Sequence, residues 1–87
     1  MQKLKEKVTS ALSLPKEIAL DLPIVTATGR GELVIENYKN LLEFAETQIR
    51  IRTREGIITV EGERLTLQQI TTENLLVVGY IVSISYA

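Results

Sequence analysis

Apolar and polar side chains alternate along most of the chain after residue 30. Aliphatic residues occupy every second position in ELVIENY, QIRIRTR and RLTLQQI; these residues are Leu33, Ile35, Ile49, Ile51, Leu65 and Leu67. Successive side chains of a β-strand point to opposite faces, so this alternation is typical of strands with one buried face. The pattern therefore predicts a chain built mainly from β-strands.

Short segments rich in Gly, Asn or Thr separate these runs and predict turns. They are Gly29-Arg30-Gly31, Lys39-Asn40, Glu55-Gly56, Gly62-Glu63 and Thr71–Asn74. Turns spaced by roughly 8–12 residues are typical of a small, mainly antiparallel sandwich or roll. A short β-solenoid is the alternative, because stacked strands use the same alternation.

The last segment, LLVVGYIVSISY, has one unbroken apolar face. That face consists of Leu76, Val78, Tyr80, Val82, Ile84 and Tyr86. Such a strand is about twice the usual length, so Gly79 predicts a bend or bulge within it. We expect Tyr80 and Tyr86 to pack in the core with their hydroxyls at its periphery.

The N-terminal segment has a different pattern. In residues 2–14, Leu4, Val8, Ala11 and Leu12 share one face at helical spacing. Pro15 bounds the segment, since the residue before a proline is driven out of the helical region. We therefore expect residues 1–14 to form a short amphipathic, basic α-helix or arm, and residues 15–87 to form a single β domain.

The amino-acid composition excludes the commonest types of enzyme active site. The 87 residues are 45% hydrophobic and include neither Cys nor His. The commonest zinc ligands, a His-based triad and any disulfide are therefore absent. Asp21 is the only Asp, and a lone carboxylate is weak evidence for catalysis. We expect no enzymatic activity and no cofactor.

Positive charge is concentrated at two places along the chain. Lys3, Lys5 and Lys7 lie in the N-terminal segment, whereas Arg50, Arg52 and Arg54 alternate in QIRIRTR. Three guanidiniums in a row on a strand are a candidate contact for an anionic surface. The simpler interpretation is a solvated strand face that pairs with Glu side chains on neighbouring strands. The net charge of −1 disfavours nucleic acid as a partner.

The order of residues resembles the YabP/YqfC family of small sporulation proteins, and most of all its YqfC branch. The resemblance rests on LPKEIALDLP with its paired prolines, the IENY segment, and the glycine pair Gly56 and Gly62 in REGIITVEGE. It covers about Leu14 to Tyr86. The resemblance implies a protein made in the mother cell of endospore-forming bacteria, often encoded beside a membrane-associated sporulation protein.

Together, these observations predict a non-enzymatic interaction or assembly module of the spore envelope or coat. The expected partners are another sporulation protein at a membrane and further copies of the chain, joined through β edges. An adaptor that binds a membrane or cell-wall polymer through its Arg and Lys residues is the alternative. No apolar run approaches the ~20 residues of a membrane span, so we expect a cytoplasmic protein. The resemblance implies that this is the mother-cell cytoplasm, with the protein peripheral to the forespore membrane.

Overall fold

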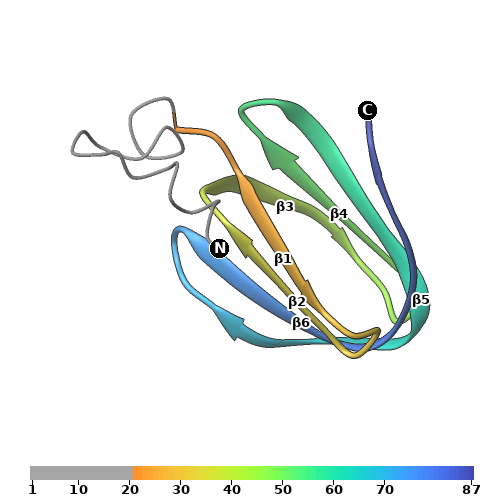
Figure 1. The fold of residues 1–87 in the computed structure, drawn as a ribbon. Coiled ribbons are helices and arrows are strands. Elements are labelled where there is room, and N and C mark those ends of the chain that lie inside the picture. The colour runs from red at the N-terminus through yellow and green to blue at the C-terminus, as the bar shows by residue number, and fades with distance from the viewer. Residues whose placement is uncertain (1–20) are drawn as a thin grey trace, which may run out of the picture.

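The computed structural model describes residues 21–87, which form six β-strands (Figure 1). The strands are β1 (Ile24–Thr28), β2 (Glu32–Glu36), β3 (Tyr38–Phe44), β4 (Gln48–Thr53), β5 (Gly56–Ile70) and β6 (Asn74–Tyr86). The all-β prediction is confirmed for this part of the chain. The predicted helix or arm over residues 1–14 lies outside the described residues. No helix long and apolar enough to cross a membrane occurs in residues 21–87.

All six strands belong to one antiparallel sheet in the order β1-β2-β6-β5-β4-β3. The solenoid alternative is wrong, because a solenoid stacks its strands in parallel, whereas every neighbouring pair here is antiparallel. The long strands β5 and β6 curve from one part of the sheet to the other, at the lower right of Figure 1. The bend in these strands divides the sheet into two halves, which we call the β1 half and the β3 half after the first strand of each.

Each half combines two short strands with parts of both long ones. In the β1 half, β1 and β2 join the beginning of β6 and the end of β5. In the β3 half, β3 and β4 join the beginning of β5 and the end of β6. Two long strands therefore connect the halves without any loop between them.

A single apolar core lies on the inner face of the sheet. It contains all but one of the alternating residues named from the sequence, together with others on β5 and β6: Leu33, Ile35, Ile49, Ile51, Ile58, Val60, Leu65, Leu75, Val77 and Ile81. Val25, Tyr38, Leu67 and Ile84 pack against it. Most members are aliphatic and fully buried, so their removal from water is the main favourable contribution to folding.

The sheet bends where Gly62 on β5 and Gly79 on β6 allow the long strands to approach closely. Gly79 has a φ of 148°, and a Cβ there would lie 2.6 Å from the backbone oxygen of Arg64. Arg64 itself has a φ of 54°, opposite a shift in the β5–β6 register. The predicted bend at Gly79 is confirmed. The predicted turn at Gly62-Glu63 is wrong, because β5 continues through both residues.

A second register shift changes which face the end of β6 presents. After the shift at Val82, Ile84 pairs with Val60 and Tyr86 with Ile58. Opposite residues of a sheet share a face, so Ile84 and Tyr86 lie on the inner side. The unbroken apolar face expected from the sequence is thus split. Tyr80 and Tyr86 are 49% and 64% exposed, so their predicted core packing is wrong.

Two turns differ from the predicted ones. The β2–β3 connection is the single residue Asn37, with a φ of 66°, and the expected turn at Lys39-Asn40 falls within β3. Asn is among the residues that best tolerate positive φ. The β4–β5 hairpin turns through Arg54 and Glu55, one residue earlier than predicted.

Candidate functional site

The arginine stripe is shorter than its spacing implies. Arg50 and Arg52 alternate on β4 with buried residues, which places both on the outer face; the buried residues are Ile49, Ile51 and Thr53. Arg54 lies in the β4–β5 turn instead of the strand. The stripe therefore contains two strand residues and one turn residue, and the regular row of three guanidiniums does not form.

One arginine of the stripe pairs with a glutamate on the neighbouring strand, as the simpler interpretation expected. Arg50 faces Glu43 across the β3–β4 pair, and its Nη1 lies 3.8 Å from the Glu43 Oε1. Arg52 faces Asn40 and Ile57 on its two neighbouring strands. Among residues 21–87, the ion pairs within 4 Å are Arg50–Glu43 and Lys39–Asp21. Lys3, Lys5 and Lys7 lie outside the described residues.

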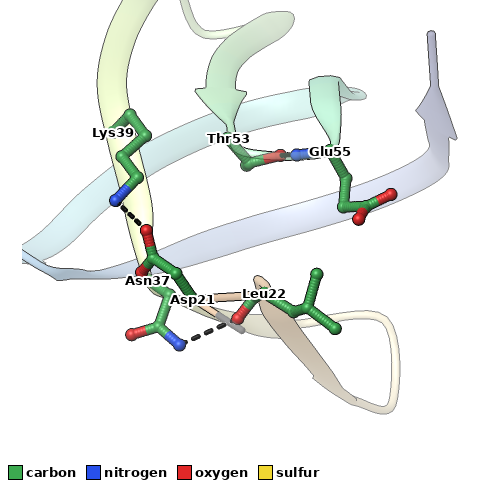
Figure 2. Close-up of polar contacts among 6 residues, drawn as sticks. All are labelled: Asp21, Leu22, Asn37, Lys39, Thr53 and Glu55. Atoms are coloured by element: carbon green, nitrogen blue, oxygen red, sulfur yellow. Dashed lines mark hydrogen bonds and ion pairs between the residues drawn. The ribbon is translucent and has the colours of Figure 1, made fainter. Parts of the chain in front are cut away.

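Asn37 forms a corner that joins the two halves at the end opposite the bends. Its side chain donates a hydrogen bond to the Leu22 carbonyl oxygen at 2.8 Å, as Figure 2 shows. Its backbone N–H donates to the Glu73 carbonyl oxygen at 2.8 Å. Lys39 pairs with Asp21 beside it (Figure 2). These contacts hold the start of the described chain and the β5–β6 turn against the link.

Thr53 stabilises the neighbouring hairpin turn from inside the fold. Its hydroxyl accepts a hydrogen bond from the Glu55 N–H at 3.0 Å, drawn in Figure 2, and donates to the Gly56 carbonyl oxygen at 2.9 Å. The residue is only 6% exposed. Its polar group is buried but satisfied, so it serves the turn and not a ligand.

Arg30 occupies the edge of β6 next to the bend. Its backbone oxygen accepts a hydrogen bond from the Ile81 N–H at 2.9 Å, and its Nη1 donates to the Ile81 carbonyl oxygen at 3.0 Å. The guanidinium carbon also lies 5.5 Å from the centroid of the Tyr80 ring. The β1–β2 turn is therefore fastened to β6 at Ile81, and the edge of β6 is free only after that residue within the described chain.

Exposed apolar side chains gather on the edges of the β3 half. The large exposed hydrophobic residues are Leu41, Leu42, Phe44, Ile70, Tyr80, Val82 and Tyr86. All but Ile70 lie on β3 or on β6 from the bend onward, and these two strand segments are the edges of that half. Exposed apolar side chains along a strand edge are unusual in a monomer, because such an edge readily pairs with strands of other chains.

The outer face of the β1 half has a shallow hollow of about 190 Å³. It is lined by Val34, Glu36, Gln69, Thr71, Asn74, Leu75 and Leu76. No group of three or more Asp and Glu side chains in residues 21–87 is arranged to hold a metal ion. The hollow is thus lined by apolar and uncharged polar residues together with one carboxylate, that of Glu36.

The sequence predicted that Arg50 and Arg52 lie on one face of a strand. It did not predict the corner at Asn37 or the contact of Arg30 with Ile81. The positive φ of Asn37 could have been suspected, since Asn follows an alternating run directly. Arg30 and Ile81 are 51 positions apart, and no local pattern relates them. Simple alternation places Tyr80 and Tyr86 in one apolar row, but Tyr80 precedes the register shift at Val82 and Tyr86 follows it, so the two side chains lie on different faces.

Comparison with known proteins gives two similarities. The model of the YabP family matches residues 23–87, which include every strand of the structure. The chain is also 32% identical over 84 residues to "Uncharacterized protein YqfC" of Bacillus subtilis (strain 168). That alignment covers 97% of this chain and 90% of the relative.

Proposed function

The chain belongs to the YabP family, and from this premise we propose that it is a non-enzymatic protein-interaction module in assembly of the spore envelope or coat. The sporulation setting comes from the resemblance noted in the sequence. Its proposed place is the mother-cell cytoplasm at the forespore membrane, beside a membrane-associated sporulation protein. Its proposed working surface is the pair of strand edges of the β3 half.

One observation carries this proposal: all but one of the large exposed apolar residues lie on the strand edges of the β3 half. Leu41, Leu42 and Phe44 lie on β3, and Val82 and Tyr86 lie at the end of β6. Single exposed apolar residues are ordinary, whereas a group along an edge favours a partner that covers it. Partner strands that add to an edge gain main-chain hydrogen bonds, and side chains beside them give selectivity.

A complementation experiment tests the proposal in a sporulating host. A strain lacking the gene would receive the wild-type gene or Phe44→Ser, and heat-resistant spores would be counted. Phe44 is 48% exposed, so the substitution changes the edge and spares the core. We expect few resistant spores with Phe44→Ser despite normal protein levels. Normal spores from the strain without the gene would refute a role in sporulation.

The matched control is Ile70→Ser, on the end of β5 in the other half. Ile70 is 56% exposed, so it removes a similar amount of exposed apolar surface. We expect this variant to restore sporulation. Equal defects in both variants would indicate a general effect of reduced hydrophobicity and would count against the edge of the β3 half.

The second candidate function is an adaptor for an anionic surface, proposed from Arg52 and Arg54. Both are exposed, and within residues 21–87 neither has a carboxylate within 4 Å. The test measures binding to vesicles with anionic lipid at low and high salt. Binding that falls with salt and is lost in Arg52→Gln/Arg54→Gln would support the adaptor. Binding unchanged by both substitutions would eliminate it.

A further inference from the structure

The end of β6 has free backbone hydrogen-bonding groups on the side away from β5. Ala87 and Ile57 exchange both backbone hydrogen bonds, at 2.9 and 3.1 Å. Hydrogen-bonded and non-hydrogen-bonded pairs alternate along an antiparallel ladder. Ser85 therefore bonds to Thr59, whereas Ile84 and Tyr86 direct their N–H and C=O groups outward. No strand among residues 21–87 pairs with that side.

This edge lacks the features that usually prevent strands from pairing. Residues 82–87 include no charged residue and no Pro, and the register from Ser83 to Tyr86 is regular. The edge strand β3 differs, because it has two register shifts and carries Lys39. Bulges and edge lysines disfavour the addition of a strand, so β3 would contact a partner through its apolar side chains, whereas β6 can also pair through its backbone. Arg30 occupies the edge only at Ile81, which leaves the segment beyond it open.

We propose that two copies of this chain associate through the ends of their β6 strands, which pair antiparallel about a two-fold axis at Ser85. This inference deepens the proposed function by naming the edge and one partner. In this register Ile84 of each copy lies opposite Tyr86 of the other. The four bonds between them satisfy every outward N–H and C=O group of both residues.

Side chains favour the same register. Tyr86 lies on the inner side but is 64% exposed, while Ile84 is half-buried. Opposite each other, the ring of one copy covers the exposed part of the isoleucine of the other, a favourable aromatic and β-branched pair. Ser85 is exposed on the outer face and lies opposite Ser85 of the other copy. Since serine is uncharged, no like charges meet at the axis. The eight strand segments of the two β3 halves become one sheet.

Charge substitutions at the axis test this arrangement in the full-length chain. Ser85→Lys and Ser85→Glu each place like charges directly opposite, so each should weaken the dimer by about tenfold or more. Mixed in equal amounts, the two variants should form a heterodimer. Analytical ultracentrifugation over a range of concentrations measures all three. Ser83→Lys is the control, since Ser83 is also exposed on the outer face but lies off the axis, and it should dimerise like the wild type.

Several results would overturn the proposal. These are a wild-type chain that stays monomeric at every concentration, self-association that Ser85→Lys does not change, and a mixture that does not associate. Slow hydrogen exchange at Ile84 and Tyr86 in the monomer would also refute it, because another part of the chain would then cover the edge. A monomeric wild type whose gene still restores sporulation would leave the proposed function standing and remove only the second copy.

Discussion

Replacing Gly79 by alanine tests the close approach on which the bend of the sheet depends. The new Cβ would lie 2.6 Å from the Arg64 backbone oxygen and 2.9 Å from the Leu65 Cα. Both atoms belong to the backbone of β5, so no flexible side chain can give way. The alanine would also have to adopt a φ of 148°, which residues with a Cβ rarely do. Either β5 or β6 must therefore move.

The expected loss of stability follows from these two effects. A non-glycine residue in such a backbone conformation costs about 1–3 kcal/mol. Forcing an extra methyl group into a close-packed contact costs about 1–3 kcal/mol more. Together they give roughly 2–6 kcal/mol, whereas a chain of this length has about 4–13 kcal/mol of stability in all. We expect Gly79→Ala to remove about half of it.

Two other glycines separate the two effects. Gly29 has a φ of 57° and nothing within 4 Å of its added Cβ, so Gly29→Ala measures the backbone cost alone, about 1–2 kcal/mol. At Gly62 the φ is not positive, but the added Cβ would lie 2.0 Å from the Tyr80 backbone oxygen. Gly62→Ala therefore measures crowding alone, about 1–3 kcal/mol.

Urea unfolding followed by circular dichroism measures all three variants against the wild type. The midpoint should fall most for Gly79→Ala while the slope of the transition stays constant, because the same surface is exposed on unfolding. In thermal scans, each kcal/mol corresponds to about 4–8 °C in a domain of this size. Equal losses for Gly79→Ala and Gly29→Ala would refute the argument, since they would show that the contact with β5 carries no cost.

Three further predictions use the same measurement. Ile51→Ala should cost about 2–5 kcal/mol and Ile51→Val only about 0.5–1.5 kcal/mol, because Ile51 is fully buried; equal losses would contradict its place in the core. Asn37→Ala should cost about 2–3 kcal/mol through its φ of 66° and its bond to Leu22, whereas Asn37→Gly should lose only the bond; the reverse order would contradict the strained corner. Arg50→Gln should cost less than about 1 kcal/mol, since its pair with Glu43 is exposed; a larger loss would show that the pair is structural.

The sequence predicted the strands well because most of them have one buried face. Leu33, Ile35, Ile49 and Ile51 lie in the core as their alternation indicates, and Gly79 marks the bend. Alternation reports only the local direction of a side chain, and it loses phase wherever the ladder slips. The shift at Val82 therefore places Ile84 and Tyr86 on the opposite face from Tyr80, and the single apolar row predicted from the sequence is divided.

Other features depend on contacts between distant parts of the chain. The link at Asn37 is held by Leu22 and Glu73, whose proximity follows from the order of the strands. The turn expected at Gly62 was wrong for a related reason. That glycine serves the approach of β6 instead of a reversal of β5, and a sequence cannot distinguish these two uses of glycine.

The candidate site was predicted only in part. Arg50 and Arg52 lie on the outer face of β4 as expected, but Arg54 left the strand because the hairpin turns one residue earlier. The free edge of β6 could not be inferred, because which strands lie at an edge depends on the order of the whole sheet.

The two long strands also determine how the β1 half and the β3 half are oriented relative to each other. Since β5 and β6 run through both halves and pair with each other on both sides of the bend, two continuous strands join the halves in residues 21–87. The angle between the halves is therefore set by the bend in these two strands and not by a connecting loop. A protein held at the outer face of the β1 half and another held at the β6 edge would be kept at an angle fixed by Gly62 and Gly79.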